Sequence, residues 1–366
     1  MPRRGDDFSV SGKLFESNGM NSGISGLLKL YEEEDPFGRN VLSREYDRLI
    51  QRGKTIVLCN PSYLPLNYTR VQLDKEGNEH IYWDLLSACD EKAARVYFTA
   101  PGSGLFSVKK GKLGVIGRKG EFLPCFNSLN LTLDTISFFI GDKEDMKHLE
   151  TQVGPTQLLN PPLLENLLED KRLVFGFLDK YLPEVVLPWC WSEALSYKAV
   201  TRAMDNLGSD MIVGKPARGS LGKGVTFFSS GMAERDISGL IAQAGYLKDT
   251  DRWVFQAYEP SICSFSGQDS HTSIRAISFG TYLGGYVHGY CRTLPAEGKD
   301  AASLNRTAIV NLDKGATPKE IPSSHQAMVL EQSGKLDMAF NNIYDHTLIE
   351  IEHWVAAKQI SHHYLF

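Results

Sequence analysis

The chain has 366 residues, of which 42% are hydrophobic, and its formal net charge at pH 7 is −5. A chain of this length can bury a substantial core, and its length predicts two or three domains. Charges of both signs are well mixed, which argues against a nucleic-acid-binding or membrane-surface protein. No apolar run approaches the ~18 residues that a membrane span needs. We therefore expect neither a nucleic acid nor a membrane as a partner.

The N-terminal segment and the cysteines indicate the compartment. The segment MPRRGDDFSVSGK begins with basic residues but has no apolar stretch of the kind that a secretory signal contains. Its polar, Gly- and Ser-bearing character predicts that residues 1–22 form a flexible or loosely docked tail. The cysteines have no paired spacing, which is typical of buried thiols in a reducing cytoplasm. They are Cys59, Cys89, Cys125, Cys190, Cys263 and Cys291.

Residues 23–157 show strand-like runs separated by helical ones, a pattern that predicts an open α/β domain. A short helix is expected over Ser43–Arg52. Glycine-rich turns after strands of such sheets usually face a ligand crevice, although the turns at Asn60–Ser62 and Pro101–Gly104 are equally compatible with plain turns. The expected strands are Lys54–Asn60, Ala94–Thr99, Leu113–Ile116 and Thr135–Ile140.

From residue 158 the pattern becomes helical. Leucines and phenylalanines recur at spacings of three and four through residues 158–188, which predicts a helical connector that stops before Leu182–Pro183. The apolar Pro188–Trp191 segment is expected to be a linker between domains. Further on, the sequence predicts the helices Ser196–Leu207, which Gly208 ends, and Ala233–Ala244, and the strand Arg252–Tyr258.

A glycine-rich hairpin occupies the middle of the chain. The strand Met211–Val213 leads through Lys215 to a loop, and a second strand, Val225–Phe228, follows the loop. Closely spaced glycines allow backbone N–H groups to approach an anion, and lysines on flexible stems suit polyphosphate. The GxxxxGK[ST] pattern of a P-loop is missing, so we expect a hairpin lid. An ordinary surface hairpin with a basic tip is the alternative. The loop includes Gly219, Ser220, Gly222, Lys223 and Gly224.

Four features in order along the chain resemble the ATP-grasp superfamily. They are Asp170-Lys171 at a helix start, Lys215 before the glycine loop, Gln256 to Glu259 at a strand end, and Arg275 with Arg292 on later strands. The resemblance covers about residues 158–315. It implies an α/β and α+β protein, in which an N-terminal open α/β (pre-ATP-grasp-like) domain, 23–157, precedes a two-subdomain ATP-grasp fold. The small subdomain with the lid would span 189–256 and the C-terminal subdomain 257–366.

The resemblance also implies roles for individual residues. The two lysines and the loop would bind the phosphates of ATP, and the strand end would bind adenine through backbone N–H and C=O groups, which we expect to be unpaired there. Glu259 would accept from the ribose hydroxyls, and Asn305 matches the family's Asn-and-Gly stretch near the phosphates. The two arginines would hold the γ-phosphate and an acyl phosphate. The nucleotide-binding set is therefore Lys171, Lys215, Gly219, Ser220, Gly222, Lys223, Gly224, Gln256, Ala257, Tyr258, Glu259 and Asn305, and the catalytic set is Arg292, Arg275 and Lys215.

Each of these residues also has an ordinary structural interpretation. For Lys171 the alternative is an exposed helix lysine, with Lys180 as a nearby competitor for its role. Glu259 precedes a proline and fits a solvated turn. Arg275 lies in an alternating strand, where a structural ion pair is the usual role of an arginine, while Arg292 precedes a polar loop that favours function. His271, close to Arg275, is more typical of a surface residue.

The metal site departs from the family's pattern. Family members usually end with an acidic residue on one strand and a Glu-x-Asn on the next, and these hold two magnesium ions. After Asn305 no clear Glu-x-Asn follows in this sequence. Magnesium prefers oxygen ligands, few of them from protein, so Asn311 and Asp313 are the predicted Mg²⁺ ligands. The helical residues Asp337, Asn341, Asn342 and Glu350 are the other acids and amides available.

The reaction that the resemblance implies is ATP-dependent ligation of a carboxylate to an amine through an acyl phosphate. Such catalysis depends on positioning, charge stabilisation and exclusion of water, and it needs no nucleophilic side chain. Expected substrates are amino acids or small peptides, with an intramolecular lactam as a variant and natural-product biosynthesis as a setting. A kinase with the same nucleotide grip and a non-catalytic nucleotide-binding module are the alternatives. A homodimer is the default oligomer.

Overall fold

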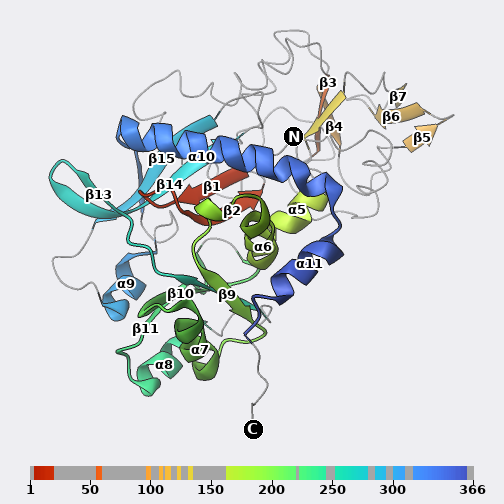
Figure 1. Cartoon of the computed structure of the whole chain (residues 1–366). Coiled ribbons are helices and arrows are strands. Elements are labelled where there is room, and N and C mark those ends of the chain that lie inside the picture. The colour runs from red at the N-terminus through yellow and green to blue at the C-terminus, as the bar shows by residue number, and fades with distance from the viewer. Residues whose placement is uncertain are drawn as a thin grey trace. The chain divides into compact units, whose positions relative to one another are not determined.

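Figure 1 shows a computed structural model of the chain. The structure describes residues 4–19, 55–59, 96–99, 107–109, 112–116, 122–124, 131–134, 162–219, 222–244, 252–278, 285–293, 300–309 and 316–360. In the strands between residues 55 and 134 and in 285–293, only the backbone is described. The chain divides into two compact units: Met1–Arg4, Gly19–Glu165 and Ile277–Gly285 form the first, and Gly5–Asn18, Asn166–Ala276 and Tyr286–Phe366 form the second.

The first unit contains two three-stranded sheets. In one, β3 (Thr55–Cys59) lies between β4 (Val96–Thr99) and β8 (Leu131–Asp134), and both pairs are parallel. Parallel pairing needs crossover connections, which fits the α/β character expected from the sequence. The other sheet is antiparallel and consists of β5 (Ser107–Lys109), β6 (Lys112–Ile116) and β7 (Phe122–Pro124). The strands expected around residues 54–60, 94–99 and 113–116 are thus confirmed.

The second unit contains a four-stranded antiparallel sheet that carries the glycine hairpin. Its order is β11 (Thr226–Ser229), β10 (Met211–Pro216), β12 (Trp253–Ala257) and β9 (Trp189–Ser192). Helices α7 (Tyr197–Leu207) and α8 (Glu234–Ala244) cover one face through a buried apolar cluster that includes Ile212, Phe228 and Phe255. Gly208 ends α7 in the left-handed conformation, as predicted. The predicted hairpin and both predicted helices are confirmed.

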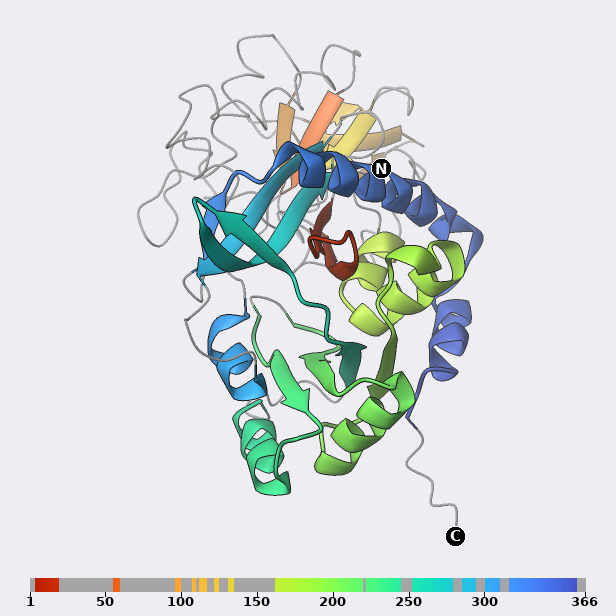
Figure 2. The same cartoon turned by 60° about the vertical axis from the view of Figure 1, so that its left-hand side comes forward.

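A six-stranded sheet forms the other part of the second unit. Its order is β16 (Thr317–Lys319), β15 (Gly285–Thr293), β14 (Gln268–Ser278), β1 (Arg4–Phe8) and β2 (Leu14–Gly19), and β13 (Ile262–Phe265) also pairs with β14. The long helix α10 (Ser323–Asn341) crosses these strands (Figure 2). The first two strands of the chain therefore sit beside strands that come more than 250 residues later.

The remaining helices border these two sheets. Helix α6 (Lys171–Tyr181) follows α5 (Pro162–Leu168) and ends before Leu182, as predicted. Helix α11 (Leu348–Ala356) begins with a capping box and packs against α6, and α9 (Ala301–Thr307) packs against β11. Phe177 of α6 stacks on Phe340 of α10 with ring centroids 5.7 Å apart. Short 3₁₀ helices lie at Pro183–Val185 and Asn342–Asp345.

Two sequence expectations are wrong. Residues 4–19 do not form a loosely docked tail, because β1 is buried along its whole length and its polar side chains are paired inside the sheet. Pro188–Trp191 is not a linker, because Trp189–Ser192 pairs with β12 as a strand. The expected helix Ser43–Arg52 and strand Thr135–Ile140 lie outside the described residues. Within the described part of the chain, no helix has both the length and the apolar character to cross a membrane.

Candidate functional site

The N-terminus of α6 holds the start of the glycine loop. Asp170 caps the helix, and Lys171 follows as its first residue. The backbone N–H of Lys171 donates to the Ala217 carbonyl at 2.9 Å, and its Nζ donates to the Gly219 carbonyl, also at 2.9 Å. Lys171 is 7% exposed, so it is not the exposed helix lysine of the alternative interpretation. The structure thus brings together the first predicted lysine and the predicted lid.

Lys215 lies on β10 and is equally buried. Its Nζ donates to the backbone carbonyl of Phe15 at 2.9 Å and to Gln256 Oε1 at 2.6 Å. Burial lowers the pKa of Lys215 to about 8, and the nearby cation Lys171 also lowers it, while Glu16 acts in the opposite sense. An ammonium group has three hydrogens, and these two contacts leave one of them for a further acceptor. Lys215 is therefore a buried cation with spare donor capacity.

Glu16 on β2 connects the two lysines. Its Oε1 lies 2.9 Å from Lys171 Nζ, and the residue before it, Phe15, accepts from Lys215. Burial acts to raise the pKa of Glu16, but Lys171 and Lys215 oppose this, and the net pKa lies below its usual value. Glu16 is therefore a carboxylate at neutral pH. This residue was not among those predicted.

Asp7 and Arg275 form a second buried pair beside Glu16. Arg275 Nε donates to Asp7 Oδ1 at 2.6 Å, and Arg275 also donates through an NH2 group to Asp7 Oδ2. Burial raises the pKa of Asp7, Arg275 opposes this shift, and the negative charge of Glu16 adds to it. Because the charge of Glu16 changes the pKa of Asp7, the two carboxylates are close enough to interact. The structural interpretation of Arg275 as an ion-pair partner is confirmed, and its role toward a phosphate stays a prediction.

The N-terminal hairpin contains a Glu-x-Asn, the motif that does not follow Asn305. Glu16-Ser17-Asn18 lies on β2, and the acidic residues Asp6 and Asp7 lie on the preceding strand β1. Asp6 accepts from Ser17 Oγ and, at 3.5 Å, from Ser333 Oγ of α10, so Asp7 is the aspartate that lies near Glu16. The motif is visible in the sequence. It was missed because the family's chain order directed the search to residues after Asn305.

The donor set on β1 and β2 fits magnesium. Mg²⁺ usually takes one or two carboxylates from protein and completes its shell with phosphate oxygens and water. Asp7, Glu16 and Asn18 provide two carboxylates and an amide oxygen. Among the described residues, no cluster of three or more His, Cys, Asp or Glu side chains that could hold a metal ion is found. The predicted ligands Asn311 and Asp313 lie outside the described residues.

The end of β12 differs from the sequence expectation. The N–H groups of Ala257 and Tyr258 donate to the carbonyls of Pro188 and Met211, each at 2.9 Å, so they are not unpaired groups of an open strand end. The expectation failed because β12 lies between two partner strands, β9 and β10. Glu259, the predicted ribose ligand, accepts from Ser11 Oγ at 2.7 Å. The side chain of Gln256 accepts from Lys215 through Oε1 at 2.6 Å.

The glycine loop has the backbone conformation that its sequence suggests. Gly222 and Gly224 have φ angles of 65° and 74°, a region that favours glycine because a Cβ would be strained there. Lys223 between them is exposed, which leaves its charge free of burial costs. Ser220 lies outside the described residues. The described part of the loop thus contains two glycines with positive φ angles beside an exposed lysine, and its binding role stays a prediction.

Asn305 has a structural role, and the side chain of Arg292 is not described. Asn305 forms two hydrogen bonds of 2.8 Å with the backbone of Phe227 and a third with Ala301, so its amide ties α9 to the edge strand β11. This is a structural role, and nothing in these contacts supports its predicted binding of nucleotide. Arg292 lies on β15 as expected, and its side chain is not described.

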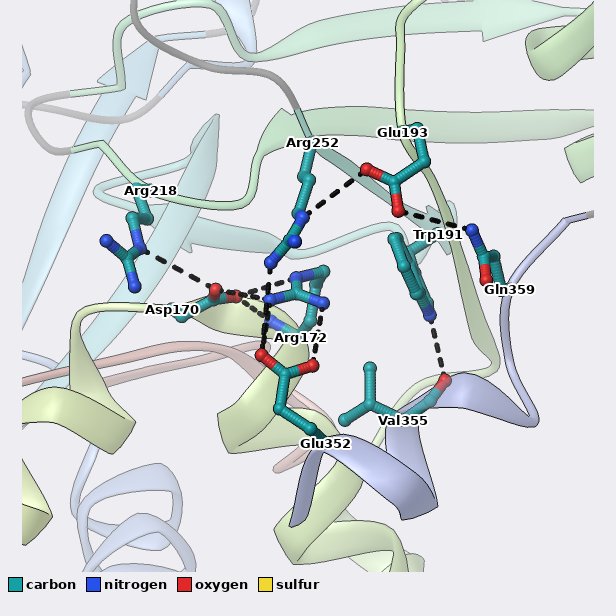
Figure 3. A network of polar contacts seen from close by, with 9 residues as sticks. All are labelled: Asp170, Arg172, Trp191, Glu193, Arg218, Arg252, Glu352, Val355 and Gln359. Atoms are coloured by element: carbon teal, nitrogen blue, oxygen red, sulfur yellow. Dashed lines mark hydrogen bonds and ion pairs between the residues drawn. The ribbon is translucent and has the colours of Figure 1, made fainter. Parts of the chain in front are cut away.

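Figure 3 shows a network of charged groups around Asp170 and Arg172, at the start of α6. Arg172 is 1% exposed, binds Asp170 at 2.7 Å and Glu352 of α11 at 3.2 Å, and lies 4.7 Å from the centre of the Trp191 ring. Its neighbours extend the network through Arg218–Asp170, Arg252–Glu352, Arg252–Glu193 and Gln359–Glu193 contacts. The network links α6, α11 and the four-stranded sheet, and it fixes the position of Lys171.

No protein-family model matches the chain, and no curated protein matches it. Several solved structures match the chain. The D-cycloserine synthetase DcsG is 15% identical, with 78% of this chain and 82% of that chain covered and a TM-score of 0.36. D-alanyl-alanine synthetase A from Vibrio cholerae is 13% identical, with coverages of 80% and 82% and a TM-score of 0.42. The macrocyclase MdnC from Microcystis aeruginosa, bound with its precursor peptide MdnA, is 12% identical, with coverages of 76% and 82% and a TM-score of 0.35.

By their names, these three proteins are two synthetases and a macrocyclase. Because every identity is below 25% and every TM-score below 0.5, we base no functional inference on these likenesses.

Proposed function

We propose that this protein is an ATP-dependent ligase that joins a carboxylate to an amine and releases ADP and phosphate. One observation carries the proposal: Lys171 of a helix contacts Glu16 of the N-terminal hairpin and Gly219 of the glycine loop, and Lys215 of the neighbouring strand contacts the backbone of Phe15 beside Glu16. A buried cluster assembled from such distant segments is a specific arrangement, and perturbed titratable groups of this kind are common at functional sites.

The positive charge of the cluster supports triphosphate as its ligand. Among the described residues, Lys171 pairs with Glu16 and Arg275 pairs with Asp7, whereas Lys215 contacts two neutral acceptors and no carboxylate. Burying an unbalanced charge is costly, and an anionic ligand relieves that cost. In the proposed complex, the spare N–H of Lys215 and the ammonium of Lys171 bind phosphate oxygens, and the glycine loop closes over them.

Asp7, Glu16 and Asn18 would hold magnesium in that complex. The ion, when bound, neutralises charge on the phosphates. Glu16 would exchange its contact with Lys171 for the metal, which frees Lys171 to bind phosphate. The presence of this Glu-x-Asn also removes the reason for the alternative of a non-catalytic module, since that alternative arose from the apparent lack of the motif.

The proposed reaction has two steps. A carboxylate oxygen of the first substrate attacks the γ-phosphorus, the bond to the β,γ-bridging oxygen breaks, and ADP leaves. The amine of the second substrate then attacks the acyl carbon, phosphate leaves, and the amine loses a proton. Arg275 and Arg292 would stabilise the transferring group and the departing phosphate. Amino acids or small peptides are the proposed substrates, and an amine within the same molecule would give a lactam.

The experiment is a phosphate-release screen over pairs of amino acids and short peptides with MgATP, followed by mass spectrometry of the products. The proposal predicts ADP and phosphate only when a carboxylate and an amine substrate are both present, together with a product lighter by one water than the pair. A phosphorylated product without free phosphate would instead indicate a kinase. Stabilisation by nucleotide without any turnover across the screen would indicate a binding module. Either outcome contradicts the ligase.

A further inference from the structure

The side chain of Asn305 takes the place of a neighbouring strand on β11. Its Nδ2 donates to the Phe227 carbonyl at 2.8 Å, and the Phe227 N–H donates to its Oδ1, also at 2.8 Å. Two residues that face each other in an antiparallel ladder exchange the same pair of bonds. Because β11 is at the edge of its sheet, this side of Phe227 faces no further strand in the described part of the chain. Asn305 therefore anchors α9 to the strand that follows the glycine loop.

A third contact fixes the orientation of this amide. Nδ2 of Asn305 also donates to the Ala301 carbonyl, one turn earlier in α9, at 2.9 Å. Both amide hydrogens are thus used, and the amide oxygen accepts from Phe227. A flipped amide would direct its oxygen at two carbonyls and its NH₂ group at an N–H group. An ionised aspartate has nearly the same shape but no donor, so it would lose two of the three contacts and repel both carbonyls.

Helix α9 covers the face of the four-stranded sheet that carries Lys215. Two α9 side chains pack in a buried cluster with Val213 and Phe227, whereas the neighbouring Ile212 belongs to the cluster under α7 and α8. Successive residues of a strand point to opposite faces, so α9 lies on the face opposite to these two helices. Lys215 is two residues beyond Val213 on β10, so its side chain points to the face of α9. Helix α9 thus packs on the side of the sheet where the proposed phosphate site lies.

The chain reaches α9 from the six-stranded sheet and returns to that sheet afterwards. Strand β15 ends one residue after Arg292, and β16 begins at Thr317, which pairs with Cys291. Both ends of this connection therefore lie beside Arg292, while α9 within it contacts the other sheet. Helix α9 has seven residues, and isolated helices shorter than about 12 residues are unstable in water. Its helical form therefore depends on its contact with β11.

We propose that Asn305 is a positioning residue: it docks α9 on β11 and thereby holds the strand that follows the glycine loop in a fixed position relative to the end of β15, where Arg292 lies. The inference rests on the proposed function, in which the glycine loop and Arg292 bind phosphates of the same nucleotide. A ligand held by both parts favours the docked state of α9, and by linkage the docked state binds that ligand more tightly. Asn305 acts through β11 and needs no contact of its own with the nucleotide.

The test is hydrogen exchange of the whole chain, read by mass spectrometry, with and without the magnesium complex of a non-hydrolysable ATP analogue. In the wild type we expect β11 and α9 to show equal protection, because they open together, and the bound analogue to slow exchange in both by about tenfold or more. In Asn305→Asp both segments should exchange fast, and the Kd of the analogue, measured by calorimetry, should rise about tenfold, as the loss of two hydrogen bonds suggests. A purely structural contact would change neither the ligand dependence of exchange nor the Kd.

Asn342→Asp is the matched control. The amide of Asn342 also donates to the carbonyl four residues earlier, that of Met338, at 3.3 Å, but it lies at the end of α10, so exchange in β11 and α9 should equal that of the wild type. Binding of the analogue without any change of exchange in β11 and α9, or with the same Kd in Asn305→Asp, would overturn the inference and leave the proposed function intact. If the wild type does not bind the analogue, the proposed function is overturned together with the inference. If Asn305→Asp does not fold, wild-type exchange with and without the analogue decides the question.

Discussion

Two groups of charges meet at the start of α6, and they differ in how their members are paired. Around Arg172, guanidinium groups and carboxylates are equal in number and each is paired (Figure 3). In the group around Lys215, Lys171 pairs with Glu16 and Arg275 pairs with Asp7, but Lys215 itself has no carboxylate partner among the described residues. Consecutive residues of one helix, Lys171 and Arg172, belong to the two groups.

We expect the first group to stabilise the fold and the second group to bind the ligand. A paired network is complete without a ligand, so its removal should affect mainly folding. An unbalanced cluster is costly without a ligand, so its removal should affect mainly binding and turnover. Substitutions around Arg172 should therefore lower the unfolding free energy more than the turnover, and substitutions around Lys215 should lower the turnover more than the unfolding free energy.

The largest effect on turnover is expected at Glu16. Glu16→Gln keeps the shape of the side chain but removes a proposed metal ligand, and we expect ligase turnover to fall by about a hundredfold or more, since losses of that order follow even from changes outside the direct ligands. The measurement is the rate of ADP release as a function of magnesium concentration. The control is Glu331→Gln, which changes an exposed glutamate on α10 that pairs only with Lys335. Equal rates for both variants would contradict the assignment of Glu16.

The position of Glu16 also shows what the sequence could and could not predict. Periodicity and end signals correctly predicted the lid hairpin, α7, α8 and the strand that holds Gln256, because these elements are stabilised by local patterns. The composition of residues 4–19 suggested a loose tail, since Asp6 and Asp7 are unusual in a buried strand. Their partners Ser333 and Arg275 lie 327 and 268 residues away in the chain, so no local pattern reveals them.

The same reason explains the other errors. Trp189–Ser192 is too short to be distinguished from a linker by periodicity, and it becomes a strand because β12 pairs with it. The expectation of free N–H groups at Ala257 and Tyr258 failed because β12 is not an edge strand. Lys215 and Gln256 lie on strands that a continuous pattern predicts, whereas the contact of Glu16 with Lys171 depends on which strands and helices are neighbours.

The largest effect on stability is expected at Arg172. Arg172→Met removes the cation that neutralises the buried Asp170, and breaking a buried pair in this way typically costs about 3–5 kcal/mol of unfolding free energy. Lys215→Met should change the unfolding free energy by no more than about 1 kcal/mol, since its two neutral acceptors lose one hydrogen bond each and a buried charge is relieved. It should abolish turnover. Urea unfolding and ADP release on both variants measure the contrast, and equal stability losses would contradict it.

A pH titration of the wild-type protein separates the effect of Lys215 on stability from its effect on nucleotide binding. The pKa of Lys215 is lowered from its usual 10.5 to about 8, so between these values the unfolded chain binds a proton that the folded chain does not. The contribution of Lys215 to stability therefore rises as the pH increases from about 8 to 10.5, while its attraction for phosphate is lost. We expect nucleotide affinity to fall above pH 8 as Lys215 loses its charge. In Lys215→Met this component of the pH dependence should be missing, and its persistence would assign the titration to another group.

The smallest effect is expected at Arg218, which belongs to the balanced network only at its surface. Its side chain is 65% exposed and its Nε lies 3.7 Å from Asp170, which already binds Arg172. Exposed ion pairs contribute roughly 0–1 kcal/mol, so Arg218→Ala should leave the unfolding free energy within about 0.5 kcal/mol of the wild type. Arg218 directly precedes Gly219, whose carbonyl accepts from Lys171, so this variant also tests whether the contact holds the lid. A changed nucleotide dissociation rate with unchanged stability would move Arg218 from the supporting network to the binding cluster.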